Sequence, residues 1–246
     1  MSYHLFLSYD ISGDLGEQLF QLSNIYKFAK ESRKNNIKRK IVFKKGNKYW
    51  DTIFCGLFRL YEDDVYDTIK FKEVSQDFSD YYGEKSNIML KVSKYEFCDD
   101  IREKMTKIIY NDEDLMYKAY YKYREILDYY GKDTKDSDVV CLDYKRDIDI
   151  NYYKEALNII DINNLVVFCD KKDDIVDLFD SKYNIYYVEN VDTEMGLILY
   201  SMFQYNILSD NLEYLWATYI SHYDVKKIIA PENLRQYNNK YVSDYL

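Results

Sequence analysis

The carboxy-terminal half of the chain alternates short apolar runs with segments of helical periodicity. Continuous apolar runs, rather than runs in which every second residue is polar, are typical of parallel strands that helices cover on both faces. This pattern predicts a doubly wound parallel sheet. The expected strands are Val139–Leu142, Leu165–Cys169, Ile185–Val188, Asn206–Ser209 and Lys227–Ala230, and the expected helices span 152–160, 173–179, 193–205 and 212–222.

The amino-terminal third opens with a further strand, loop and helix. An apolar run at His4–Tyr9 predicts a strand, and from Leu15 apolar residues recur at helical spacing. A second strand is expected at 40–43, whereas 44–95 gives only weak signals. Between 99 and 130 the pattern predicts two helices, the second capped by Asp112.

The polar, turn-rich segment 131–137 is the best place for a domain boundary. We therefore expect one domain over residues 1–134 and a second over residues 135–246.

Composition places the chain among globular proteins. Its 246 residues are 47% hydrophobic, and the formal net charge of -9 disfavours a surface built to bind nucleic acid. Residues 1–50, however, carry ten Lys and Arg against four Asp and Glu, a net of +6. This basic region either faces an anion or is the solvated end of a helix and its exit loop. Thirty tyrosines and one proline are typical of AT-rich genomes, such as those of giant viruses.

The sequence predicts a cytoplasmic protein without a membrane span. No apolar run reaches about 18 residues, and the first ten residues do not form a signal peptide. The four cysteines are too far apart to pair as zinc ligands, and two histidines do not suffice for a histidine-based metal site. We expect neither a metal nor a bound cofactor.

The sharpest motif follows the first strand, where Gly13-Asp14-Leu15-Gly16-Glu17-Gln18-Leu19-Phe20-Gln21 opens the helix. Two glycines allow backbone amides to approach a ligand at a helix amino terminus, where a phosphate or carboxylate is favoured, although such turns are often only structural. Seven of the nine positions agree with the Gly-Gly-Leu-Gly-Asn-Gln-Leu-Phe-Gln opening of the α-1,2-fucosyltransferase family. The chain resembles a divergent member of that family.

Further motifs of the family are degraded. Its His-x-Arg-Arg-Gly-Asp segment corresponds to Asp143-Tyr144-Lys145-Arg146-Asp147, which lacks the histidine and the glycine. By the resemblance, Arg146 grips the β-phosphate of the donor and stabilises the leaving nucleotide, while Lys145 supplies a point charge. The alternative is a charged surface loop. Asp147-Ile148-Asp149 has the spacing of a metal-binding Asp-x-Asp loop, which we interpret as chance in so acidic a chain.

Two more segments match the family in order. Asp170, at the end of an expected strand, stands where an aspartate could accept hydrogen bonds from guanine, or it caps the next helix. Ser209 and Asn211 stand where the family presents polar groups to phosphate. The resemblance covers about half the chain, namely the first 35 residues and about 138–231.

The resemblance implies a GT-B-like α/β fold, in which two Rossmann-like domains face a cleft. It also implies an inverting, metal-independent glycosyltransferase that moves fucose or a related deoxyhexose from a GDP-sugar to a glycan. Glu17, at the family's asparagine position, is the candidate base, with Asp14 and Asp10 nearby; alternatively, Glu17 only favours the helix dipole. The competing hypothesis is a non-catalytic or altered-donor relative that acts as a glycan-binding or interaction module. A small nucleotide-binding regulator fits less well, because the chain has no phosphate-loop lysine motif.

Overall fold

The structure is a computed structural model that describes residues 5–44, 46, 48–49, 51–57, 66–75, 78–91, 96–179, 181–223, 226–237, 240 and 242–246. His4, the expected first residue of the first strand, lies outside this set. The chain forms two compact units, residues 1–108 and residues 109–246. This division falls one helix earlier than the boundary expected after residue 134, and it places the helix Glu113–Tyr130 with the second unit.

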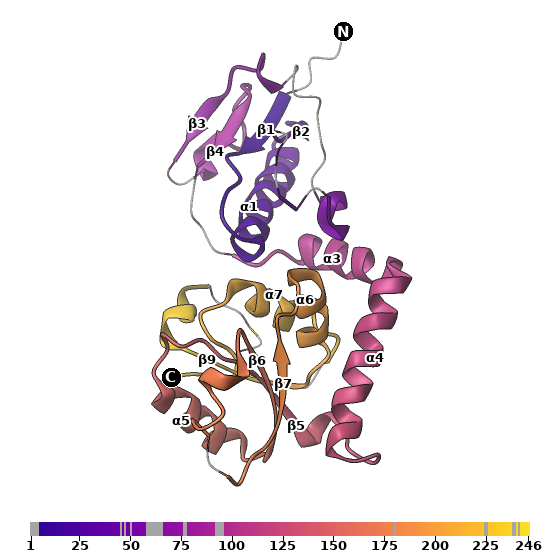
Figure 1. Ribbon diagram of the computed structural model, residues 1–246. Coiled ribbons are helices and arrows are strands. Elements are labelled where there is room, and N and C mark those ends of the chain that lie inside the picture. Colours follow the sequence, from indigo (N-terminus) through magenta and orange to yellow (C-terminus); the bar gives the residue numbers. More distant parts are fainter. Residues whose placement is uncertain are drawn as a thin grey trace. The chain divides into compact units, whose positions relative to one another are not determined.

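Unit 1 is built on a parallel sheet of four short strands in the order β2-β1-β4-β3 (Figure 1). The strands are β1 (Leu5–Tyr9), β2 (Arg39–Ile41), β3 (Lys72–Val74) and β4 (Ile88–Leu90). Helix α1 (Leu15–Lys34) packs on the sheet through fully buried side chains that include Leu15, Leu19 and Leu22. The central strand β1 leads directly into the glycine loop, so the loop lies at the carboxyl end of the sheet.

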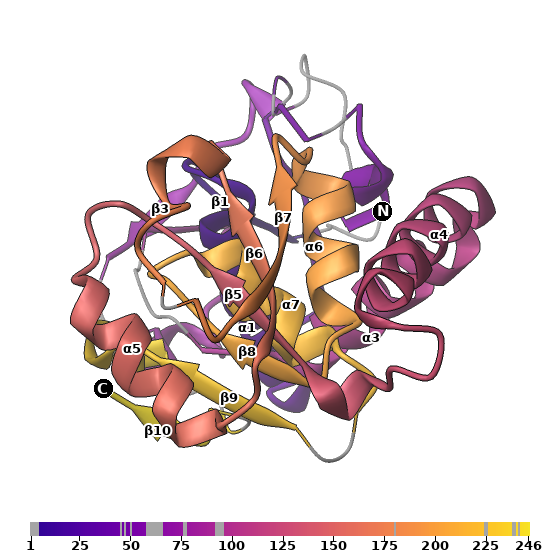
Figure 2. The same cartoon turned by 60° about the horizontal axis from the view of Figure 1, so that its bottom comes forward.

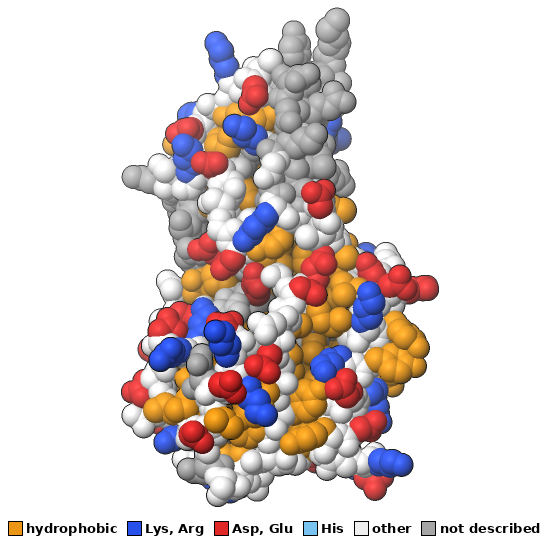
Figure 3. Space-filling model, viewed as in Figure 1, with side chains coloured by type: hydrophobic (Ala, Val, Ile, Leu, Met, Phe, Trp, Pro, Cys, Tyr) orange, Lys and Arg blue, Asp and Glu red, His pale blue; other side chains and the backbone are white. Residues whose placement is uncertain are grey.

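Two helices follow in the chain, α3 (Asp99–Asn111) and α4 (Glu113–Tyr130). The carboxylate of Asp112 accepts a hydrogen bond from the Leu115 amide at 3.0 Å, and Gly131 ends α4 with a φ of 135°. Both ends of α4 are therefore as expected. In unit 2 the inner face of α4 packs beside α6 (Thr193–Ser201), whereas tyrosines stay exposed on its outer face, where hydrophobic side chains gather in Figure 3.

Unit 2 contains a six-stranded sheet in the order β10-β9-β8-β5-β6-β7, in which every recorded pair is parallel. The chain runs outward from β5 to β7 on one side and then returns to build β8 to β10 on the other. This is the doubly wound arrangement that the sequence predicts. The strands are β5 (Val139–Asp143), β6 (Asn164–Cys169), β7 (Asn184–Glu189), β8 (Tyr205–Ile207), β9 (Lys227–Ala230) and β10 (Asp244–Tyr245).

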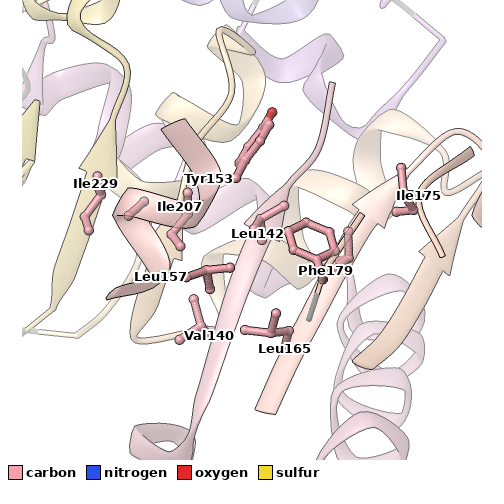
Figure 4. Close-up of a cluster of buried hydrophobic side chains, with 11 residues drawn as sticks. Val140, Leu142, Tyr153, Leu157, Leu165, Ile175, Phe179, Ile207 and Ile229 are labelled. Atoms are coloured by element: carbon pink, nitrogen blue, oxygen red, sulfur yellow. The ribbon is translucent and has the colours of Figure 1, made fainter. Parts of the chain in front are cut away.

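Helices cover both faces of this sheet (Figure 2). Helix α5 (Ile150–Ile160) covers one face over a buried cluster that includes Val140, Leu142 and Val167 (Figure 4). On the opposite face, the Phe168 ring lies 5.4 Å from Tyr200 of α6 and 5.5 Å from Tyr214 of α7 (Leu212–Ile220). Because neighbouring residues of a strand point to opposite faces, continuous apolar strands are needed here.

Two expected elements of unit 2 differ from the structure. The helix expected over 173–179 is wrong: the segment forms a 3-10 turn, Lys172–Asp174, followed by irregular turns. Ile175 and Phe179 still reach the core, and this helical spacing misled the prediction. The helix expected over 193–205 ends at Ser201, because the chain turns there and begins β8 at Tyr205.

Candidate functional site

The strand order of unit 2 indicates where a ligand would bind. Strands β5 and β8 are neighbours, but the chain leaves β5 in one direction and β8 in the other. At such a switch point the loops diverge and leave a crevice beyond the carboxyl ends of the strands. The loops concerned follow β5, β6 and β8, and they contain every site residue that the sequence predicts in this unit.

A cavity of about 410 Å³ opens beyond β5 and β6, within the range of small-molecule sites. The two strands pair in register, and the Tyr144 amide extends the pairing by donating to the Phe168 carbonyl at 2.9 Å. This pairing brings Lys145, Arg146 and Asp170 to one cavity. Its lining also contains Asp147, Cys169 and Lys171, the first of which stands in the motif segment after β5.

The two basic residues of the loop after β5 differ in their contacts. The Lys145 ammonium pairs with the Asp210 carboxylate at 2.6 Å, and the Lys145 amide donates to the Tyr153 hydroxyl at 2.9 Å. Arg146 is exposed and forms no ion pair within the part of the chain that the structure describes. The guanidinium of Arg146 is therefore available to an anion, whereas the charge of Lys145 is partly compensated.

Beneath this loop lies a buried carboxylate that the sequence analysis did not single out. Asp143 ends β5 with 4% of its surface exposed, and it accepts hydrogen bonds from the hydroxyl of Ser209 and, at 3.3 Å, from the Ser209 amide. Burial raises the pKa of Asp143 to about 7, although the Ser209 hydrogen bond and nearby Lys145 act in the opposite direction. The position of this carboxylate directly after four apolar strand residues could have indicated its burial.

Ser209 and Asn211 hold the loop between β8 and α7. The Asn211 amide donates to the Ser209 hydroxyl oxygen at 3.2 Å, and the Asn211 side-chain oxygen caps α7 by accepting from the Glu213 and Tyr214 amides. Neither residue lines the cavity beside Arg146. In this structure their polar groups bind the loop itself and Asp143.

The remaining predicted site residues lie in unit 1. Gly13 has a φ of 90°, a conformation that favours glycine, and a Cβ atom there would lie 1.6 Å from a Glu17 carboxylate oxygen. Gly16 is buried in the first turn of α1. Two glutamines of the same motif fasten the loop: Gln18 donates to the Gly13 carbonyl at 3.0 Å, and Gln21 exchanges two hydrogen bonds with the backbone of Ser12.

Glu17 takes part in a capping box. The Asp14 carboxylate accepts from the Glu17 amide at 2.8 Å, and the Glu17 carboxylate accepts from the Asp14 amide at 3.2 Å. Acidic residues at the N-cap and at N3, here Asp14 and Glu17, are a sequence sign of a capping box. The sequence analysis did not predict this capping box. The contacts give Glu17 a structural task, and its role as a base stays a prediction.

The described residues contain neither a cluster suited to a metal ion nor a helix suited to a membrane span. Among them, no group of three or more His, Cys, Asp or Glu side chains is arranged to hold a metal ion. Asp149, in the Asp-x-Asp segment, caps α5 by accepting from the Asn151 amide at 2.9 Å. No described helix combines the length and apolar character needed to cross a membrane.

Comparison with known proteins gives a likeness in structure. No protein-family model and no curated protein sequence matches the chain. Among solved structures, the chain is similar to Arabidopsis thaliana FUT1, a fucosyltransferase, in an arginine-to-lysine variant in complex with GDP. The TM-score is 0.54 at 10% sequence identity, and the match covers 89% of this chain and 68% of that one. The predicted GT-B-like α/β fold is thus confirmed, while the cleft expected between the domains stays a prediction.

Proposed function

We propose that the chain is a glycosyltransferase that uses a GDP-sugar, with fucose or a related deoxyhexose as the transferred group, and a glycan as acceptor. One observation carries the proposal: Arg146 and Asp170 line one cavity at the carboxyl ends of neighbouring parallel strands, in a fold shared with a fucosyltransferase solved with GDP. Transfer would proceed with inversion and without a metal, as the family resemblance implies.

Three residues of the cavity have a chemical task in this proposal. The exposed guanidinium of Arg146 binds the β-phosphate through two parallel hydrogen bonds and stabilises the charge that develops on the leaving nucleotide. Asp170, also exposed, accepts hydrogen bonds from the N1 and N2 edge of guanine. Lys145 contributes less, because Asp210 already occupies its ammonium group.

On the acceptor side, Glu17 is the proposed base. It accepts the proton of an acceptor hydroxyl as that oxygen attacks the sugar carbon and the bond to the nucleotide breaks. The Asp14 amide contacts one of its carboxylate oxygens at 3.2 Å. This contact orients the carboxylate without neutralising it.

Thermal denaturation with GDP, UDP, dTDP and CMP tests the donor site. We expect GDP to stabilise the protein most, by about 2.7 kcal/mol at a hundredfold excess over its dissociation constant. Arg146→Ala should remove most of this gain, whereas Arg235→Ala, which removes an exposed arginine elsewhere in unit 2, should leave it intact. The absence of any nucleotide effect in the wild-type protein would contradict the proposal.

A second candidate function rests on the altered loop after β5. The resemblance places a histidine where this chain has Asp143, and that carboxylate is buried against Ser209. Such a loop suits a non-catalytic or altered-donor relative that binds glycans. Incubation with GDP-fucose and mixed glycan acceptors distinguishes the two: tight GDP binding without hydrolysis or transfer favours the binding module.

A further inference from the structure

A second cavity lies in unit 1, at the opposite end of α1 from the glycine loop. Its volume is about 540 Å³, and its walls come from the carboxy-terminal part of α1, from β2 and from α3, all of which are labelled in Figure 1. Tyr26, Ala29 and Ile41 contribute apolar surface. The cavity is large enough for a small organic ligand.

The polar lining of this cavity is predominantly basic. Asp100 and Glu103 are its two acidic residues, and one of them pairs with Lys30 at 3.1 Å. Four of the basic residues belong to residues 1–50, whose net charge of +6 contrasts with the -9 of the whole chain. Like charges repel, so the arrangement favours an anion between them. The basic residues are Lys30, Arg33, Arg39, Lys40, Lys104 and Lys107.

Arg39 forms a rigid part of the wall. It is 7% exposed, its guanidinium donates to the backbone carbonyls of Ser86 and Glu84, and it lies 5.5 Å from the centre of the Phe28 ring. Its Nε atom is buried and has no hydrogen-bond acceptor among the residues that the structure describes. No carboxylate of the described residues forms an ion pair with it. Burial lowers the pKa of Arg39, whereas Glu84, which pairs with Lys72, attracts the Arg39 guanidinium without forming an ion pair with it. An anion in the adjacent cavity would further stabilise this buried charge.

Arg33 and Lys107 face the cavity from α1 and α3. Both are exposed, and neither forms an ion pair with the residues that the structure describes. Their charged groups are therefore free to bind a ligand that enters from solvent. Lys104, beside them, lies 5.0 Å over the Tyr26 ring, which keeps its positive charge at the wall.

We propose that this cavity binds a phosphate or sulfate ester of a small molecule. Arg33 and Lys107 contact the anionic group directly, and the fixed charge of Arg39 stabilises it from behind. The apolar surface of Tyr26, Ala29 and Ile41 leaves room for the organic part of the ligand. This site is separate from the cavity beside Arg146, and the inference does not depend on the proposed glycosyltransferase function.

Isothermal titration calorimetry on the full chain tests the inference with three probes: glucose 6-phosphate, glucose 6-sulfate and uncharged glucose. We expect the two esters to bind and glucose not to bind. Stronger binding of the phosphate or of the sulfate identifies the preferred ester. Arg33→Glu with Lys107→Glu should weaken binding about tenfold or more. Arg33→Gln with Lys107→Gln should also weaken binding, because it removes the two positive charges without adding negative charges that repel the ester.

Two controls make the outcome specific. Lys44→Glu with Lys85→Glu makes the same charge change at exposed lysines of unit 1 outside the cavity, and we expect unchanged affinity. Arg146→Ala should also leave the affinity unchanged. If the Lys44 and Lys85 pair of changes weakened ester binding equally, the effect would come from the net charge of the protein rather than from the cavity. If only Arg146→Ala lowered the affinity, the ester would bind in unit 2. Either result, or a wild-type protein that binds none of the esters, overturns the inference.

Discussion

The buried carboxylate of Asp143 predicts a specific dependence of stability on pH. Because burial raises its pKa to about 7, the folded chain keeps a proton there at pH values where an unfolded aspartate, with a pKa of about 3.9, has released it. The stability linked to this proton is fully present below the unfolded pKa and is lost as the pH rises through the folded value. The contribution of Asp143 to the stability of the wild-type protein should therefore fall between about pH 4 and pH 7.

Asp143→Asn isolates this effect, because asparagine keeps the shape and can still accept the hydrogen bonds from Ser209 but does not titrate. The free energy of unfolding of the variant, minus that of the wild type, should rise with pH. One proton gives at most about 1.4 kcal/mol per pH unit, or roughly 4 kcal/mol over the whole interval. The sign is opposite to that of a carboxylate stabilised by an ion pair.

Urea denaturation at half-unit steps from pH 4 to pH 8 measures the difference. Trp216, fully buried in α7, reports on unit 2, and a Trp50→Phe background isolates its fluorescence. Asp147→Asn removes an exposed carboxylate of the same loop and controls for the loss of one negative charge. Ser209→Ala removes a hydrogen bond that lowers the pKa of Asp143. In this variant the fall in stability should therefore extend to higher pH. A difference that stays constant from pH 4 to pH 8 would refute the reasoning.

Three further predictions concern the loops that carry the site. Arg146→Ala should weaken GDP binding more than Lys145→Ala does, as measured by titration, because Lys145 is already paired with Asp210; the reverse order would mean that the motif is displaced by one residue. Glu17→Gln keeps a capping box but removes basicity, so transfer should fall about 10²-fold at nearly unchanged stability; an active Glu17→Gln protein would end the assignment of the base. Gly13→Ala should destabilise unit 1 by about 1–2 kcal/mol in urea denaturation, because alanine disfavours a φ of 90°; an unchanged midpoint would contradict that strain.

The fold was predictable where burial on both faces leaves a continuous apolar run. Strands β5, β6 and β9 are buried over most of their length and fill such runs. The strands β7 and β8 were also expected, although β7 is a half-buried edge strand. The missed strands are too short to show a period: β10 has two residues, while β3 and β4 have three each, and two of the three β3 residues are exposed. Their place in a sheet is decided by pairing with neighbours distant in sequence, which local patterns do not record.

The site was predictable in part for a different reason. Arg146 and Asp170 each follow a strand, and the carboxyl ends of parallel strands meet at one edge, so their shared cavity follows from the topology. The contacts of Lys145 and Ser209 could not be read from the chain, because their partners Asp210 and Asp143 lie 65 and 66 residues away in sequence.

The loop after β5 combines a firm framework with an altered binding surface. Asp143 ties the end of β5 to the loop after β8, and the Tyr153 hydroxyl holds the Lys145 amide, so the backbone is fixed without the family's histidine and glycine. In the proposed donor site, Arg146 supplies the one guanidinium of the cavity lining, and it forms no ion pair with the described residues. A site with one strong phosphate contact should tolerate the loss of its neighbours better than the loss of that contact. For the proposed donor site we therefore expect affinity to depend on Arg146 to a greater degree than in a relative with two arginines at this loop.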